Sequence, residues 1–140
     1  MGVRGGLTFY QMLMAQRGQR APRHNEEHEI QSACVTWFRL QYPQYRMSLF
    51  AVPNGTYKAT HSQRRQYLDE GLLSGVSDLI LLVPNRLWHA LLIEMKTQTG
   101  RVAGTQRAFG EAAERNGYKY AVCRSLDEFM QTINDYLGLQ

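Results

Sequence analysis

The stretch Gly75–Lys96, GVSDLILLVPNRLWHALLIEMK, decides the fold. It contains two apolar runs, Leu79–Val83 and Trp88–Ile93, which are separated by the turn signature Pro84-Asn85-Arg86. Apolar runs of this length on either side of a Pro-Asn turn are typical of two antiparallel strands. The stretch therefore predicts a β-hairpin at the centre of the domain.

Two acids, Asp78 and Glu94, stand at the outer ends of the predicted hairpin. A hairpin centred on Arg86 pairs position 78 with position 94, and opposed side chains in an antiparallel pair have Cβ atoms about 5 Å apart. Lys96 lies two residues beyond Glu94, so it points to the same face of the strand. We therefore expect two carboxylates and one ammonium group to converge on one spot.

Such a spot has two interpretations. Two carboxylates held close together repel each other unless a cation lies between them, and hard oxygen ligands suit Mg²⁺ or Mn²⁺. Alternatively, Asp78 ends a turn while Glu94 and Lys96 form an ordinary solvated ion pair. These three residues by themselves leave both interpretations open.

A wider pattern surrounds this stretch and covers roughly residues 26 to 137. Its parts are Glu27-His28-Glu29-Ile30-Gln31, Phe50-Ala51-Val52-Pro53-Asn54-Gly55, GVSD, IEMK, Gly100, Gln106, Gly117-Tyr118 and Ala121-Val122-Cys123-Arg124-Ser125. In order and spacing, this pattern resembles the PD-(D/E)XK nucleases, in particular their VRR-NUC branch.

The resemblance implies an α/β fold with a restriction-endonuclease-like αβββαβ core, in which helices flank a mixed sheet. Hydrophobic periodicity and turn signals along the chain agree with this order, with one additional helix inserted before the hairpin. The expected elements are a helix from Glu26 to Pro43 capped by Asn25, a strand at Met47–Val52, a helix at Thr60–Glu70, the hairpin, a helix at Thr105–Asn116, a strand at Tyr118–Cys123 and a final helix opened by a capping box at Ser125 and Glu128.

The resemblance also implies an activity, that of a metal-dependent, structure-specific DNA endonuclease. Stand-alone members of this branch resemble junction-resolving enzymes, so we expect a homodimer acting on branched DNA such as four-way junctions. By the family pattern, Mg²⁺ or Mn²⁺ would be held by Glu27, Asp78, Glu94 and the Met95 carbonyl. The expected catalytic residues are Asp78, Glu94, Lys96 and Gln106.

Five further residues are candidates for binding nucleic acid: Asn54, Lys58, Arg64, Arg101 and Arg107. A solvated helix face of mixed charge is the alternative interpretation of the basic residues. The chain departs from the family at Ser77, where the superfamily has a proline. It departs again at Ala103-Gly104, where relatives have a serine cap and a proline, so the next helix has a less defined start.

The net charge of +4 is concentrated at the N-terminus. Residues 1 to 25 hold four arginines and no acid, and the rest of the chain has 12 basic and 12 acidic residues. We therefore divide the 140 residues into a basic arm, 1–24, and one nuclease-like domain, 25–140. A basic arm on a neutral domain is typical of nucleic-acid binding, although a flexible, soluble end has the same composition.

Cys34 and Cys123 lie far apart without a C-x-x-C motif, which predicts buried thiols in a reducing compartment. With no signal peptide or membrane span in the sequence, we expect a cytoplasmic protein without a membrane partner.

Three other functions are alternatives: an end-processing or restriction-type nuclease of the same superfamily, a DNA-binding module without turnover, and an HNH-type nuclease. The intact set of Asp78, Glu94 and Lys96 argues against the module. His24 and His28 head a helix without the ββα-metal spacing, which argues against the HNH type, and a zinc pair at these two positions has no further ligands nearby.

Overall fold

The structure is a computed structural model, and it describes residues 26–53 and 60–140. Several sequence predictions therefore lie outside the described residues. These are the basic arm, the Asn25 cap, the histidine at position 24 and the nucleic-acid candidates Asn54 and Lys58.

Four strands form one mixed sheet in the order β1-β2-β3-β4. Strands β1 (Leu49–Ala51), β2 (Leu79–Leu81) and β3 (Leu91–Met95) pair antiparallel, and β4 (Lys119–Cys123) pairs parallel to β3. A parallel pair needs a crossover connection, which α4 provides. This is the mixed α/β sheet that the sequence predicted.

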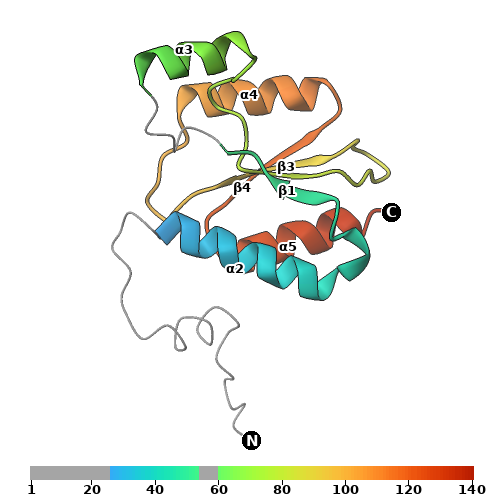
Figure 1. Cartoon of the computed structure of the whole chain (residues 1–140). Coiled ribbons are helices and arrows are strands. Elements are labelled where there is room, and N and C mark those ends of the chain that lie inside the picture. The colour runs from blue at the N-terminus through green and yellow to red at the C-terminus, as the bar shows by residue number, and fades with distance from the viewer. Residues whose placement is uncertain (1–25, 54–59) are drawn as a thin grey trace, which may run out of the picture.

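Helices cover both faces of the sheet, as Figure 1 shows. Helices α2 (Glu26–Gln41) and α5 (Leu126–Leu137) pack against each other on one face, and α4 (Gly104–Arg115) covers the other. A short 3₁₀ turn, η2 (Pro43–Tyr45), connects α2 to β1. The predicted order of helix, strand, helix, hairpin, helix, strand, helix is confirmed, and the layers form an α/β sandwich.

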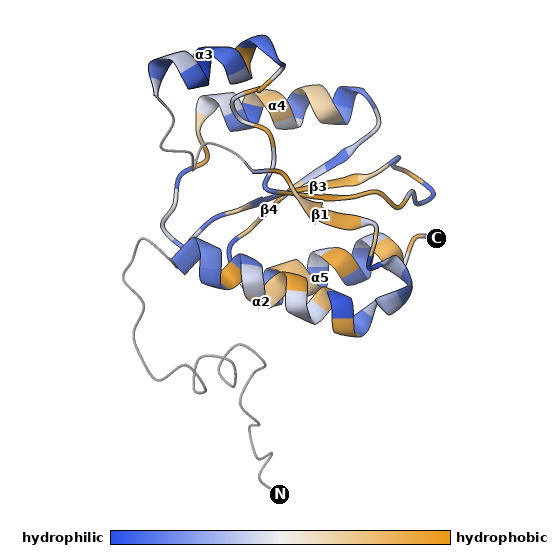
Figure 2. Cartoon of the chain, in the orientation of Figure 1, coloured by the Kyte–Doolittle hydropathy of each residue, from blue (hydrophilic) through white to orange (hydrophobic). Residues whose placement is uncertain are grey.

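The hydrophobic core lies between the sheet and the pair of helices α2 and α5. All five residues of β3 are buried, and their side chains alternate between the two faces. Leu91, Ile93 and Met95 point into this core, where they join Phe38 of α2 and Phe129 of α5. The hydropathy colours in Figure 2 show the same arrangement, because the strands are predominantly apolar while the outer helix surfaces are polar.

The hairpin has the predicted register. Leu79 pairs with Ile93 and Leu81 with Leu91, so the ladder is centred on Arg86. The strands are shorter than predicted at the turn, because the Asn85 side chain accepts hydrogen bonds from the N–H groups of Leu87 (2.9 Å) and Trp88 (2.8 Å) and so widens the loop. The second strand also continues beyond its predicted end to Met95, which places Glu94 inside the strand.

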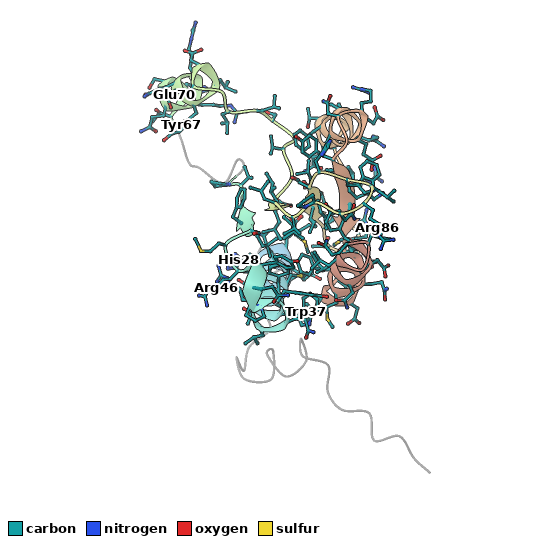
Figure 3. The ribbon with its side chains drawn as sticks, turned by 90° about the vertical axis from the view of Figure 1, so that its right-hand side faces the viewer. His28, Trp37, Arg46, Tyr67, Glu70 and Arg86 are labelled. Carbon is teal, nitrogen blue, oxygen red and sulfur yellow. The ribbon has the colours of Figure 1, made fainter. Side chains whose placement is uncertain are left out.

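Helix α3 (His61–Asp69) is the inserted element and stands apart from the sandwich. It has the predicted position and a capping box between Thr60 and Gln63, and it has no buried residue. Figure 3 shows the helix, with Tyr67 and Glu70 near its end, away from the body of the molecule, whereas Trp37 lies between α2 and α5. The strand before it is shorter than predicted, since β1 begins at Leu49 and Met47 is 93% exposed.

The outer edge of β4 is covered by two carboxylates. The Tyr120 N–H donates to Glu114 Oε1 (3.4 Å), and the Arg124 N–H donates to Glu128 Oε2 (2.7 Å). The Ser125 hydroxyl caps α5 by accepting from the Glu128 N–H (3.1 Å), as predicted. The Glu128 carboxylate binds the residue before the cap, so only half of the predicted capping box is formed.

Cys34 and Cys123 are buried free thiols, as expected. Burial raises the pKa of both thiols, which keeps them protonated and chemically quiet. Within the part of the chain that the structure describes, no helix is long and apolar enough to cross a lipid bilayer.

Candidate active site

A polar cavity of about 410 Å³ lies where β2 begins and β3 ends, beside the first turns of α2 and α4. In Figure 1 this is the end of the sheet opposite the 82–90 loop. Its lining includes the polar side chains of Glu27, His28, Gln31, Asp78, Glu94, Lys96 and Gln106. The cavity therefore gathers residues from two helices and two strands that are up to 79 positions apart in the sequence.

The two predicted carboxylates meet in this cavity. Continuing the β2–β3 register by one residue sets Asp78 opposite Glu94, as the sequence predicted. Asp78 Oδ2 accepts a hydrogen bond from the Met95 N–H (2.7 Å), so the aspartate is fixed to the opposing strand. Glu94 is only 2% exposed, which is unusual for an acid and needs a specific compensating group.

Lys96 provides part of that compensation. Its Nζ lies 3.3 Å from Glu94 Oε1 and 3.8 Å from Glu27 Oε1, so one ammonium group joins the strand-borne acid to the helix-borne acid. The lysine side chain is 15% exposed, whereas that of Glu27 is 47% exposed. The structure thus brings Glu27, Glu94 and Lys96 together, with Glu27 at the rim.

Gln106 joins α4 to the same group. Its amide Nε2 donates to Glu94 Oε1 (2.6 Å), and its amide Oε1 accepts from the Ala103 N–H (2.8 Å). Ala103 has no side chain that could accept from the Gln106 N–H, so only the reciprocal half of a capping box is formed, from Gln106 back to the Ala103 N–H. The residue that satisfies this N–H is also the one that contacts Glu94.

A glycine allows the loop that precedes Asp78 to reach α4. Gly75 has φ of +90°, and a Cβ at this position would lie 2.4 Å from the Thr105 carbonyl oxygen. A side chain at this position is therefore excluded both by the backbone conformation and by space. The close approach of Gly75 to the first turn of α4 sets the distance between the Asp78 strand and Gln106.

The electrostatics of the cavity disfavour two free negative charges. The pKa of Glu94 is raised to about 7, chiefly by burial and then by the Asp78 charge, against the charge of Lys96. Burial also raises the pKa of Asp78, against the hydrogen bond from the Met95 N–H and the charge of Lys96. The pKa of the Tyr120 phenol is raised to about 12 by burial and then by Glu94 and Asp78. The site thus has an excess of negative charge that Lys96 alone does not balance.

The sequence profile of the VRR-NUC domain family matches residues 25–127. The chain belongs to this family. A solved structure described as a "VRR_NUC domain protein" has the same fold, with a TM-score of 0.71 at 21% sequence identity over 81% of this chain and 89% of that one. No curated protein matches the chain. VRR-NUC domains are of a nuclease type, so the chain has a nuclease-type domain, which implies DNA as its substrate.

The donor groups of this VRR-NUC domain suit a hard divalent cation. Among the described residues, Glu94 Oε2 is a buried carboxylate oxygen without a hydrogen-bond partner, in a cavity that also holds Asp78. A buried carboxylate oxygen without a partner is expensive unless a cation completes it. In the described part of the chain, no three or more His, Cys, Asp and Glu side chains are spaced to hold a metal ion, so Glu27 does not form a preset three-acid group with Asp78 and Glu94.

Three of the predicted DNA-binding arginines lie outside the cavity, and two residues that line it were not predicted. Arg64, Arg101 and Arg107 are exposed, and none of them lines the cavity. His28 and Gln31 do line it, and they also line a second hollow of about 220 Å³ that continues along α2 to Arg39. The position of Gln31, four residues after Glu27 and three after His28, could have indicated this helix surface, because residues three and four apart are neighbours on a helix.

Proposed function

We propose that this protein is a metal-dependent DNA endonuclease that hydrolyses phosphodiester bonds in branched DNA. The observation that carries the proposal is the cavity in which Asp78, the buried Glu94 and Lys96 meet, within a VRR-NUC domain. Two acids and a lysine at the open end of a rigid sheet are suited to phosphate chemistry, because the scaffold fixes their positions before substrate binds.

Asp78 and Glu94 would hold Mg²⁺ or Mn²⁺, with Glu27 and the Met95 carbonyl as further ligands, as the family resemblance implies. The unpartnered Glu94 Oε2 supports this assignment. When bound, such an ion polarises the phosphate and lowers the pKa of the attacking water. The hydrogen bond from the Met95 N–H to Asp78 Oδ2 keeps this carboxylate directed along the strand end.

Lys96 would act on the reacting phosphate. Its ammonium group is held 3.3 Å from Glu94 Oε1, beside the carboxylate cluster. There it would orient the attacking water or neutralise the charge that builds up on the phosphoryl oxygens. Gln106 would fix the Glu94 carboxylate through its 2.6 Å hydrogen bond and so keep the second carboxylate oxygen free.

The surface around the cavity would bind the DNA backbone. Arg101 and Arg107 flank the start of α4, and Arg64 lies on α3. Exposed arginines near a phosphate-cleaving site contribute binding without sequence readout. A homodimer would bring two such sites to two strands of a junction, which is the assembly that the resemblance implies.

The decisive experiment compares cleavage of labelled four-way junction, flap and linear duplex with Mg²⁺, Mn²⁺ or EDTA. We expect metal-dependent cleavage of the junction, and a loss of about 10³-fold in Lys96→Ala. Lys119→Ala is the matched control, because Lys119 also pairs with a glutamate (3.6 Å from Glu114) but lies away from the cavity.

Each other outcome selects another function. A preference for linear duplex or flaps would indicate an end-processing or restriction-type nuclease. Binding of junctions without cleavage under either metal would refute the nuclease proposal and leave a DNA-binding module. A monomer in sedimentation with junction DNA would contradict the dimer.

A further inference from the structure

The segment 97–100 connects Lys96 to α4 and is held from outside by one guanidinium group. Arg124 Nη1 donates to the carbonyl oxygens of Thr97 (2.8 Å) and Gly100 (2.6 Å). Both bonds have a charged donor, which makes them stronger than bonds between neutral groups. Arg124 therefore closes the segment into a fixed loop immediately after Lys96.

The closed loop lies against the stem of Lys96. A Cβ built on Gly100 would come within 3.4 Å of Lys96 Cδ and 3.0 Å of Thr97 Oγ1. At 3.4 Å such a Cβ would be in ordinary van der Waals contact with the lysine stem, so the Gly100 backbone lies beside the middle of that stem. Arg124 binds the Gly100 carbonyl, so it fixes one side of the space that the Lys96 stem occupies.

Arg124 is itself well fixed. Its N–H donates to Glu128 Oε2 (2.7 Å), and its carbonyl oxygen accepts from Gln98 Nε2 (3.3 Å). The preceding residue, Cys123, accepts the Lys96 N–H (3.0 Å). The backbones of Lys96 and Arg124 are thus held next to each other at the ends of β3 and β4. The position of the arginine relative to the lysine backbone is therefore fixed.

We propose that Arg124 is a positioning residue for Lys96, because it presses the Gly100 backbone onto the lysine stem and holds Nζ beside Glu94. This inference rests on the proposed nuclease function. A free lysine has many rotamers, and fixing its stem lowers the entropy that must be lost when Nζ acts on the phosphate. Arginine suits the task because one guanidinium nitrogen carries two N–H groups in fixed directions and can donate to two carbonyls at once.

The test is a double-mutant cycle measured on junction DNA at saturating metal. We expect Arg124→Met to lower kcat about 10- to 100-fold with KM unchanged, and Arg124→Lys to recover part of this loss. In the Lys96→Ala background, Arg124→Met should change kcat less than 2-fold, because the group through which it acts is gone. An equal loss in both backgrounds would overturn the proposal and leave Arg124 a merely structural residue.

Arg86→Met is the matched control, since the Arg86 guanidinium also donates to a main-chain carbonyl, that of Gln140 (2.9 Å), at the other end of the sheet. It should leave kcat unchanged.

A second readout does not depend on cleavage. The chain has three lysines, so ¹³C-methylation resolves the Lys96 ε-amine, and Lys96→Arg assigns its NMR signal. We expect Arg124→Met, and not Arg86→Met, to move this signal toward the value of a solvated lysine. An unmoved signal would overturn the proposal. If the wild-type protein cuts no DNA, the nuclease proposal fails and this measurement still decides whether Arg124 positions Lys96.

Discussion

The two faces of the sheet differ in how their buried groups are satisfied. Toward α2 and α5, the core consists of apolar side chains such as Ile93 and Phe129. Toward α4, the same strand β3 presents Leu92 and Glu94, and the neighbouring β4 presents Tyr120. Within residues 26–53 and 60–140, the buried side-chain oxygens without a partner are Glu94 Oε2 and the Tyr120 hydroxyl, and both belong to the α4 face.

This difference separates stability from function on one strand. Alternation along β3 assigns odd positions to packing and position 94 to the cavity. Burial of unsatisfied polar groups destabilises a fold, and such groups persist where a site needs them. We therefore expect the apolar face to contribute most of the free energy of unfolding. The unsatisfied polar groups on the other face should reduce it.

The largest expected effect is the loss of a core side chain. Phe129 is completely buried and packs edge-on against Trp37, with ring centroids 6.1 Å apart. Phe129→Ala should lower the free energy of unfolding by about 4 kcal/mol through lost burial and a cavity. Urea denaturation measures this value. A loss below ~1.5 kcal/mol would mean that the α2–α5 face does not dominate stability.

A smaller effect concerns pH and Glu94. Its pKa rises from an ordinary value near 4.5 to about 7 in the folded protein, chiefly through burial. Between these pH values the folded state binds more protons than the unfolded state, so stability falls as pH rises. The Glu94 contribution amounts to at most about 3 kcal/mol.

Denaturation in EDTA at pH 4.5 and pH 7.5 measures the fall. In Glu94→Gln the fall in the free energy of unfolding between these pH values should be smaller by up to about 3 kcal/mol, because that variant has no charge to bury at position 94. Glu111→Gln, an exposed site on α4, is the control and should behave as wild type. An identical fall in wild type and Glu94→Gln would show that Glu94 does not titrate anomalously.

The smallest effect is expected at Tyr120. Its hydroxyl is buried without a partner, and its ring packs on Gly110, where a Cβ would lie 2.5 Å from Tyr120 Cδ1. Tyr120→Phe removes an unsatisfied polar atom and keeps the ring, so stability should stay equal or rise by up to ~1 kcal/mol. A loss above ~1 kcal/mol in urea denaturation would show that the hydroxyl has a partner in solution.

The sequence predicted the hairpin and its register because these are local properties. Symmetry about Arg86 was enough to place Asp78 opposite Glu94, and alternation placed Lys96 on the same face. The strand ends were predicted less well. The Asn85 side chain accepts hydrogen bonds from two backbone N–H groups that, in a tight turn, would be free to pair across the two strands.

Contacts between distant segments could not be predicted from the sequence. Gln106 was assigned to the site by family resemblance, and its hydrogen bonds to Glu94 and Ala103 depend on how α4 docks on the sheet. The bonds from Arg124 to Thr97 and Gly100 exist because β4 ends beside β3, a parallel pairing formed through a crossover. No spacing rule within either segment contains this information.

The carboxylates of Glu114 and Glu128, which cover the outer edge of β4, also bear on how the protein behaves at high concentration. An exposed strand edge templates pairing with other chains and so promotes aggregation. Here two outward N–H groups, those of Tyr120 and Arg124, are already bonded to acids of the same chain. A second molecule approaching this edge meets negative charge and occupied donors, so the sheet is protected against extension from the β4 side.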